Sequence, residues 1–284
     1  MLFFISFGLF ASEKNSTARE IMQRVDDQQR AAADSTLSLS RLSSCPFVIK
    51  NKKVVCHKTP RVKVIESVTR QLGDAKKDSK SISIILEPAR EQGIGMLTYS
   101  YDDSARDTES WLYLSALGKV KRMASGSGED QEPVSLFGSE FTTEDMESGK
   151  TDEYEYTIKQ EGKYAGRDVW VIEAKPKPVR LRKTDYSRIL FWIDKEKDLA
   201  LKIQTYDKQN KLFKRIMFKK FEFINKLWIA REMTVFNLRI KRLSKMKTQK
   251  IAMGIEVESS FLTQRSLTDF AYREQNLDSL RKFF

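Results

Sequence analysis

Histidine is almost absent from this sequence, since His57 is the only one among 284 residues. A single imidazole excludes a histidine-rich metal site, and any Ser-His or Cys-His nucleophilic catalysis would depend on it alone. His57 adjoins Cys56 in a lysine-rich stretch that offers no set of four metal ligands. The sequence therefore predicts no metal, no cofactor and no enzyme activity.

A glycine-rich phosphate loop is missing as well. GIGM at 93–96 lacks the spacing and the basic residue of such a loop, and GSG at 126–128 lies in an acidic stretch. The adjacent carboxylates Glu144 and Asp145 could do acid–base work. Acids in the sequence TTEDM also favour the first turn of a helix, where they meet the positive end of its dipole. The helix interpretation needs no further partner and is preferred.

Long hydrophobic runs are lacking beyond the first eleven residues, MLFFISFGLFA. This run is too short to span a bilayer as a helix and has about the length of a secretory signal core. We interpret residues 1–11 as a signal peptide that is cleaved near Ala11 or Ser12, which predicts a periplasmic protein. A buried N-terminal strand and a wrongly placed start codon are the alternatives.

Only two cysteines occur, Cys45 and Cys56, and they stand almost symmetrically about Asn51. A β-hairpin that turns near Lys50 and Asn51 would bring them together. A disulfide closing so short a loop contributes roughly 3 kcal/mol in the chain-entropy model, and it needs an oxidising compartment. Two unpaired thiols in the cytosol are the alternative.

Positive charge is concentrated in one segment. The net charge of the chain is +12, and residues 175–250 hold 23 Lys and Arg against 7 Asp and Glu. Within it, Arg239, Lys241, Lys245 and Lys247 are predicted to share one face of a strand. Such a surface suits an anionic membrane or an acidic partner, or it simply keeps the protein soluble. Nucleic acid is not expected, because the nearby aromatic residues look like sheet packing.

The order of predicted elements favours a mainly β fold of the α+β type. A helix is expected at about residues 16–33, followed from Ser35 by some thirteen short apolar or alternating runs that read as consecutive antiparallel strands in a large meander. A C-terminal helix should begin at Thr268 and Asp269, with Phe270, Leu277 and Phe284 at seven-residue spacing. No linker or repeat divides residues 12–284, which we expect to form a single domain and a monomer.

Many of these strands are apolar on both faces. In ESWLYLS, Trp111 and Tyr113 alternate with Leu112 and Leu114, and RILFWID at 188–194 has the same property. Few helices are available to cover such strands on both sides. The sheet must therefore curl around its own packed side chains or around a hydrophobic ligand.

Several motifs, in order, resemble the bacterial outer-membrane lipoprotein-sorting family, the LolA-like proteins. They are LEPAREQGIGMLTYSY at 86–101, ESWLYLSALGKVKRM at 109–123 and SLFGSEFTTEDM at 135–146. The later stretches YSRILFWIDKEKDLALKIQTYDKQNKLFKRI and SSFLTQRSL also fit, so the resemblance covers most of the chain after Ser79. The Cys45–Cys56 hairpin has no counterpart in this pattern.

The resemblance implies a strongly curved antiparallel sheet that forms an incomplete barrel, with an N-terminal helix, a short lid helix and a C-terminal helix. It also implies an apolar cavity for acyl chains. The expected lid turn comprises Gly138, Ser139, Glu140 and Asp145, with Phe137 and Phe141 pointing inward or belonging to the ordinary core. The expected cavity residues are Leu86, Met96, Leu97, Tyr99, Trp111, Tyr113, Met123, Phe137, Phe141, Trp170, Phe191 and Trp192.

By the same resemblance, the expected function is that of a periplasmic carrier or chaperone for the acyl chains of lipoproteins or phospholipids. An inner-membrane transporter would be the donor of the cargo. The rival hypothesis is a non-carrying interaction or sensor module of an envelope complex, because a fold alone does not fix a function.

Overall fold

The computed structural model describes residues 16–31, 34–73, 76–103, 105–123, 134–146 and 150–284. The predicted signal peptide, residues 1–11, lies outside these ranges. The helices are α1 (Ala18–Ala31), α2 (Thr143–Met146), α3 (Pro178–Leu181), α4 (Gln264–Thr268) and α5 (Phe270–Arg281), and three short 3-10 turns are η1 (Ala89–Glu91), η2 (Ser115–Leu117) and η3 (Thr151–Glu153). The strands are β1 (Ser35–Lys50), β2 (Lys53–Cys56), β3 (Arg61–Leu72), β4 (Asp78–Glu87), β5 (Gly95–Ser100), β6 (Glu109–Leu114), β7 (Lys119–Met123), β8 (Tyr154–Tyr164), β9 (Arg167–Pro176), β10 (Tyr186–Asp194), β11 (Leu199–Asp207), β12 (Leu212–Ile224), β13 (Leu227–Asn237) and β14 (Arg242–Met253).

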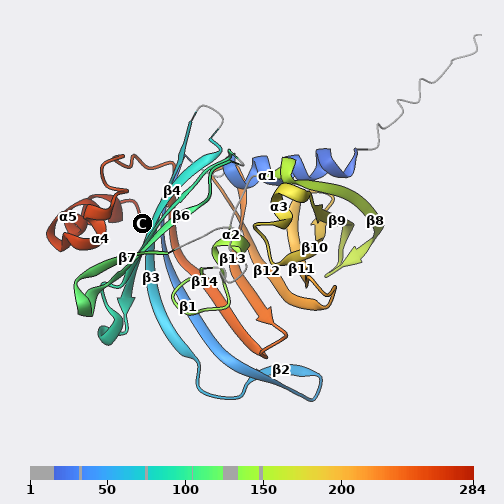
Figure 1. Ribbon diagram of the computed structural model, residues 1–284, viewed down its shortest axis with the longest axis horizontal. Coiled ribbons are helices and arrows are strands. Elements are labelled where there is room, and N and C mark those ends of the chain that lie inside the picture. Colours follow the sequence, from blue (N-terminus) through green and yellow to red (C-terminus); the bar gives the residue numbers. More distant parts are fainter. Residues whose placement is uncertain (1–15, 32–33, 74–75, 104, 124–133, 147–149) are drawn as a thin grey trace, which may run out of the picture.

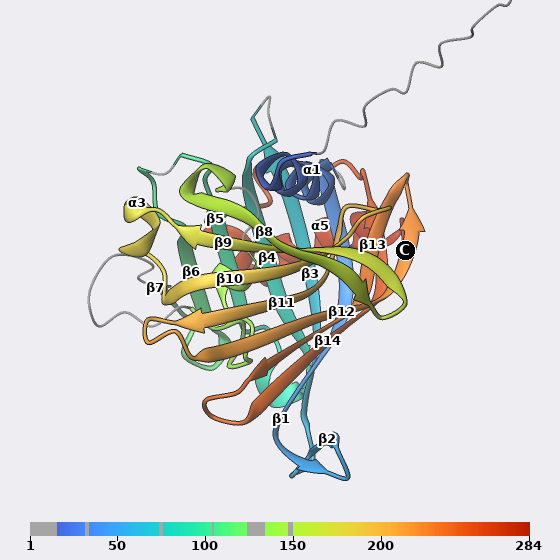
Figure 2. The same cartoon turned by 90° about the vertical axis from the view of Figure 1, so that its right-hand side faces the viewer.

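These strands form one antiparallel sheet in the order β7-β6-β5-β4-β3-β1-β14-β13-β12-β11-β10-β9-β8, and β2 pairs only with β1. Two meanders therefore stand side by side, the first formed by β1 and β3–β7 and the second by β8–β14. β1 and β14 join them along a seam in which Leu37 pairs with Ala252. The sheet is strongly curved and remains open between β7 and β8 (Figure 1, Figure 2). The predicted incomplete barrel is confirmed, although its strands do not follow one continuous meander.

Two predicted strands near the C-terminus have to be corrected. RIKRLSKMK, residues 239–247, is not one strand, because residues 238–241 form the turn between β13 and β14. KIAMGIEVESS, residues 250–260, is also not one strand. β14 ends at Met253, and Gly254 follows with a φ of 71°, a left-handed conformation in which glycine is not strained. The chain leaves the sheet there.

In the first meander a large set of apolar side chains points to the outer face, which we define as the face covered by α4 and α5 (Figure 1). A smaller set, which includes Ile65, Ile85 and Met96, lies on the inner face. Ile82 and Ile84 of β4 and Leu97 of β5 pack there against Leu267 and Leu277. The alternate positions point to the inner face, which is the face that α1 and α2 approach, and many of them are serine or threonine. The polar surface of these strands is therefore on the concave side of the sheet.

In the second meander the inner face is apolar. Ile172 and Ile193 pack against Ile21 and Val25 of α1, and all four side chains are at most 4% exposed. On the outer face of the same strands, Val171 and Trp192 belong to a smaller apolar cluster. Lys202 lies over Trp192 with its ammonium nitrogen 3.3 Å from the ring centroid. Long cationic side chains thus take the place of a covering helix on this outer face.

The C-terminal helix begins as predicted. Asp269 caps α5, and its side chain accepts a hydrogen bond of 3.0 Å from the backbone N–H of Tyr272. The predicted apolar face is only partly correct, because Leu277 is buried whereas Phe270 is 65% exposed and Phe284 is 37% exposed. The helix buries Leu277 and Leu280, which are three residues apart, against the outer face of the first meander.

We predict that Leu277→Ala lowers the free energy of unfolding by about 2–5 kcal/mol, because it removes buried apolar atoms beneath the outer face. Phe270→Ala is the matched control on the same helix, and its effect should stay within about 0.5 kcal/mol. Urea unfolding followed by tryptophan fluorescence measures both changes. Equal effects of the two substitutions would contradict the orientation described for α5.

Candidate functional site

Two cavities lie next to each other on the inner face of the described part of the chain, and the first is mainly apolar. Its lining also includes the charged residues Asp26, Glu144, Asp145, Lys150 and Arg180. It has a volume of about 290 Å³ and lies among α1, the lid helix α2 and the strands β8–β13. Thr205, which is 2% exposed, lies in its wall with a hydroxyl that has no hydrogen-bond partner among the described residues. We call it the apolar chamber, and its hydrophobic lining residues are Met22, Val25, Met146, Tyr154, Tyr156, Ala174, Tyr186, Ile189, Phe191, Ala200, Ile203, Ile216, Phe218 and Met233.

The second cavity has a volume of about 380 Å³ and lies against the inner face of β1, β3, β4, β5 and β14. Serine or threonine supplies 14 of its 23 lining residues, and we therefore call it the hydroxyl chamber. Among the described residues, Lys77 is the one charged residue in its lining, and the Lys77 ammonium lies 3.3 Å from a carboxylate oxygen of Asp102. Met146 and Met233 line both chambers, so the two cavities share a wall.

The segment Val134–Met146, which we call the lid, covers the place where the chambers meet. It folds back on itself, with the N–H of Leu136 donating to the carbonyl oxygen of Phe141 at 2.9 Å. Phe137 and Gly138 occupy the turn with φ values of 50° and 71°. Such positive values at two successive residues are typical of a tight hairpin turn, in which glycine is not strained. The predicted glycine-centred turn is present.

The helix α2 begins with a capping box. The hydroxyl of Thr142 accepts a hydrogen bond from the N–H of Asp145 at 3.4 Å, and the Asp145 carboxylate accepts one from the N–H of Thr142 at 3.0 Å. The acids of TTEDM therefore lie in the first turn of a helix, as predicted, and Thr142 is the residue that caps it. A four-residue helix receives little stability from its own backbone, so the lid depends on contacts with the rest of the protein.

Buried ion pairs supply these contacts. The Asp145 carboxylate lies 2.7 Å from the Lys214 ammonium, and the two side chains are 1% and 4% exposed. Tyr186 donates a hydrogen bond of 2.8 Å to the other oxygen of Asp145. Burial, together with the neighbouring negative charge of Asp145, raises the pKa of the Tyr186 phenol. This phenol therefore stays protonated and remains a donor to the lid.

The other two lid carboxylates are also paired. Glu140 accepts hydrogen bonds from Arg242 at 2.8 Å and from Asn237 at 3.0 Å, which ties the turn to the ends of β13 and β14. Glu144 accepts one from Arg180 of α3 at 3.0 Å. The lid is thus fixed by three separate acid–base contacts, each with a different part of the second meander.

The predicted cavity residues lie in several places. Met96 lines the hydroxyl chamber and Phe191 lines the apolar chamber. On the inner side, Met123, Phe137 and Phe141 pack in a core beside the chambers, and Trp170 packs in the cluster around α1, so none of these four lines a chamber. The placement of the others must be corrected, because Leu86, Leu97, Tyr99, Trp111 and Tyr113 pack on the outer face beneath α4 and α5, and Trp192 lies in the outer cluster of the second meander.

Most of the residues that line the chambers were not predicted from the sequence. Ile189 was recognised only as one of the alternating residues of β10, and Ile203 and Ile216 lie in the neighbouring strands β11 and β12. Alternation in SISIILE, where Ser81 and Ser83 line the hydroxyl chamber, was the available signal for the polar side. The alternation of serine and isoleucine can be recognised in the sequence, but the sequence does not indicate which face of the sheet the serines occupy.

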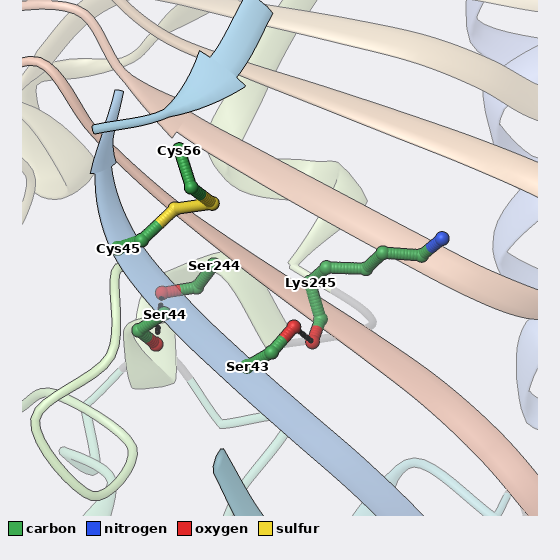
Figure 3. Close-up of a disulfide and its surroundings, with 6 residues drawn as sticks. All are labelled: Ser43, Ser44, Cys45, Cys56, Ser244 and Lys245. Atoms are coloured by element: carbon green, nitrogen blue, oxygen red, sulfur yellow. Dashed lines mark hydrogen bonds between the residues drawn. A yellow bond between two sulfur atoms is a disulfide. The ribbon is translucent and has the colours of Figure 1, made fainter. Parts of the chain in front are cut away.

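The predicted disulfide is present between Cys45 and Cys56, at the base of the β1–β2 hairpin (Figure 3). The two cysteines are not directly opposite, because Cys56 pairs with Phe47. Asn51 and Lys52 form the turn with φ values of 50° and 59°. Figure 2 shows this hairpin projecting beyond the rest of the sheet, and Ile49 at its end is 70% exposed.

The four predicted docking cations do not form one stripe. Arg239 and Lys241 lie in the β13–β14 turn, next to the base of the disulfide hairpin, where the carbonyl oxygen of Lys241 accepts a hydrogen bond from the N–H of Phe47 at 2.8 Å. Lys245 and Lys247 lie further along β14, and Figure 3 shows the Lys245 side chain running away from the disulfide.

The charge of Lys245 is largely compensated by an acid. Its ammonium lies 2.8 Å from the Glu232 carboxylate, which also lies 2.8 Å from the ammonium of Lys220. Hydrogen bonds from Lys220 and Lys245 lower the pKa of Glu232 to about 2. This carboxylate therefore stays ionised at physiological pH and neutralises part of the basic surface at that point.

Among the described residues, no group of three or more His, Cys, Asp and Glu side chains could hold a metal ion. Within the same ranges, no helix is long and apolar enough to cross a membrane.

Comparisons with known proteins agree with this architecture. A family model described as an uncharacterised protein matches residues 77–269. No curated protein matches the chain.

Three solved structures have a similar fold. A DUF1329 family protein from Desulfovibrio piger has a TM-score of 0.76 at 24% identity, with 88% of this chain and 97% of that chain covered. A domain from Vibrio parahaemolyticus, assigned to outer-membrane lipoprotein sorting, has a TM-score of 0.73 at 21% identity, with coverage of 88% and 98%. A LolA superfamily protein from Nitrosomonas europaea has a TM-score of 0.63 at 15% identity, with coverage of 87% and 98%. The predicted resemblance is therefore confirmed in the fold.

The ion pair beneath the lid yields a prediction. Lys214→Met leaves the buried Asp145 carboxylate without its cation, which should cost about 3–5 kcal/mol and loosen the lid. Hydrogen exchange of the backbone amides of Leu136 and Thr143, together with urea unfolding, measures both effects. In the double variant Lys214→Met/Asp145→Asn the charge is gone while the amide can still cap α2, so most of the loss should be recovered. If the double variant is as unstable as the single one, the ion pair does not hold the lid.

Proposed function

Because this chain belongs to the family whose model matches residues 77–269 and has the fold of LolA superfamily proteins, we propose that it is a carrier or chaperone for acyl chains. The cargo would be a lipoprotein or a lipid that crosses between two membranes. The observation that carries this proposal is the apolar chamber beneath the lid, which is lined mainly by aliphatic and aromatic side chains from α1 and β8–β13.

The size and chemistry of the chamber support this proposal. Its volume of about 290 Å³ is near the lower end of the range for ligand pockets, so it suits one chain segment at rest, and a moving lid would admit more. Each buried methylene contributes roughly 0.8 kcal/mol, so a single acyl chain supplies ample binding free energy. No covalent step is needed, and the protein would act without catalysis.

The place of action that we propose is the periplasm. A Cys45–Cys56 disulfide suits an oxidising compartment, and the apolar leader at residues 1–11 would direct export. The protein would act as a monomer of one domain, 12–284, and would take its cargo from an inner-membrane transporter. Nucleic acid has no part in this function.

The disulfide hairpin and the adjacent β13–β14 turn, which together we call the docking end, would bind the surface of an anionic membrane. From Phe47 to Arg61, both included, the chain holds four Lys, one Arg and no Asp or Glu. Ile49, Val54 and Ile240 are 70%, 43% and 55% exposed at the same end. Exposed apolar side chains with cationic neighbours suit the interface of an anionic bilayer. Arg239 and Lys241 join this surface, whereas Lys245 and Lys247 are only secondary candidates.

The first test of the proposal is binding of a fluorescent fatty acid. Phe191→Glu places a charge in the wall of the apolar chamber and should weaken binding by at least about tenfold, whereas Phe191→Leu keeps the lining apolar and should change it by less than about threefold. Trp192→Leu is the control, because Trp192 is the next residue in β10 and points to the outer face.

Thermal unfolding of each variant separates lost binding from lost folding. A folded wild type that binds no fatty acid, and carries no lipid when it is purified from its native envelope, would contradict the carrier function. That result would favour the non-carrying interaction module.

The second test concerns the docking end. Lys52→Glu/Lys53→Glu should reduce binding to vesicles of phosphatidylglycerol by about tenfold or more at low salt, because each cation near an anionic surface contributes about 1 kcal/mol. Ile49→Ser should reduce the binding that remains at high salt. Vesicle flotation measures both.

Matched controls for docking lie elsewhere on the surface. Phe223 is 57% exposed at the β12–β13 turn, and Phe223→Ser should leave vesicle binding unchanged. Lys245→Glu/Lys247→Glu carries the same change of charge as the hairpin variant. If these controls lower binding as much as the hairpin variants do, docking depends on overall charge and not on this end.

A further inference from the structure

The hydroxyl chamber has a regular wall. Thr36, Thr69, Ser81 and Thr98 occupy opposing positions on four neighbouring strands, β1, β3, β4 and β5. Ser110 of β6 continues this row beyond Thr98, but it is fully buried and does not line the chamber. Neighbouring strands lie about 4.8 Å apart, so the row repeats a hydroxyl at that spacing. Parallel rows lie on either side, with Ser38, Ser67 and Ser83 in one and Ser79 and Ser100 in the other.

Many of these hydroxyls have no hydrogen-bond partner among the described residues and can therefore bind a ligand. Ser67 and Ser83 are hydrogen-bonded to each other at 2.7 Å, and Thr98 and Ser110 at 3.3 Å. Six others make no side-chain hydrogen bond within the described ranges, and all six are partly exposed to the chamber: Thr36, Ser38, Thr69, Ser79, Ser81 and Ser100. Each can both donate and accept.

The wall of hydroxyls lies next to the apolar chamber. The two chambers share Met146 of the lid and Met233 of β13 as lining residues. An amphiphile whose acyl chain occupies the apolar chamber would place its polar end beside the hydroxyl wall. The outer faces of the same strands are packed with Leu37, Ile82 and Leu97. Serine and threonine on the inner face are therefore not a consequence of a generally polar sheet.

We infer that the hydroxyl chamber binds the uncharged polar head of the amphiphile, a head that carries hydroxyl, ester or amide groups; this inference rests on the proposed carrier function. Hydroxyls match such groups as donors and acceptors. An anionic head would be recognised mainly by cations, because charge-assisted hydrogen bonds are the stronger ones. Within the described part of the chain, the lining offers only Lys77 as a cation, and Lys77 is already paired with Asp102.

The test uses ligands with one acyl chain and different heads, which displace a bound fluorescent fatty acid from the full chain. Monolauroylglycerol has two free hydroxyls, methyl laurate has none, and dodecyl phosphate is anionic. The wild type should bind monolauroylglycerol about tenfold more tightly than methyl laurate, the gain expected from one or two net hydrogen bonds. Dodecyl phosphate should show no such gain.

The double variant Thr36→Val/Thr69→Val removes two facing hydroxyls and keeps the branched shape of both side chains. Neither hydroxyl has a protein partner within the described ranges, so the variant leaves no group unpaired and should fold. It should lose most of the preference for monolauroylglycerol while its affinity for methyl laurate stays the same. Thr157→Val on the exposed face of β8 is the control and should keep the preference.

The outcomes separate this inference from the proposed function. Equal affinity of the wild type for monolauroylglycerol and methyl laurate, or a preference that survives in the double variant, would overturn the inference and leave the carrier function standing. Tighter binding of dodecyl phosphate would overturn it as well, in favour of an anionic head. Failure of all three ligands to displace the probe would overturn the carrier function and this inference together.

Discussion

Successive side chains of a strand point to opposite faces of the sheet, and the organisation of this protein depends on which face receives the apolar set. In the first meander most of that set points outward, so α4 and α5 must cover it and much of the inner face is left for serine and threonine. In the second meander it points inward, so α1 covers part of it and a cavity remains in the rest. The contrast between the two chambers follows from this one difference in orientation.

The lid lies where the two kinds of inner face meet, and its chemistry reflects that position. Its apolar residues Phe137 and Phe141 are buried in a core with Ile65 and Ile85 of the first meander and Ile216 of the second. Its acids pair instead with cations of the second meander and its connections, among them Lys214 and Arg180. Removing one partner of a buried pair leaves an uncompensated charge, and charge-assisted hydrogen bonds also fix the relative geometry of the two groups. The charged contacts therefore define one closed position for a segment that has almost no secondary structure of its own.

The sequence predicted the local features well and the long-range ones poorly. The turn at Gly138, the helical first turn at Glu144 and Asp145 and the helix start at Asp269 depend on a few neighbouring residues, and all three are present. Trp111 and Tyr113 were assigned to the cavity, but Leu112 alternates with them and is equally apolar, so the sequence of the strand could not indicate which face α4 and α5 would cover. The turn at residues 238–241 was missed for a similar reason, since its charged residues continue the alternation of the strand that follows.

The seam between β1 and β14 also constrains the order in which the chain can fold. Leu37 and Ala252 are neighbours in the sheet although 215 positions separate them in the chain, so this pairing cannot form until nearly all of the sequence has been made. Non-local pairing of this kind is slow, because a long loop must close before any contact repays its entropy. Until then each meander has an unpaired edge that can join another chain. Any helper that binds the nascent polypeptide would do most good by shielding these two edges.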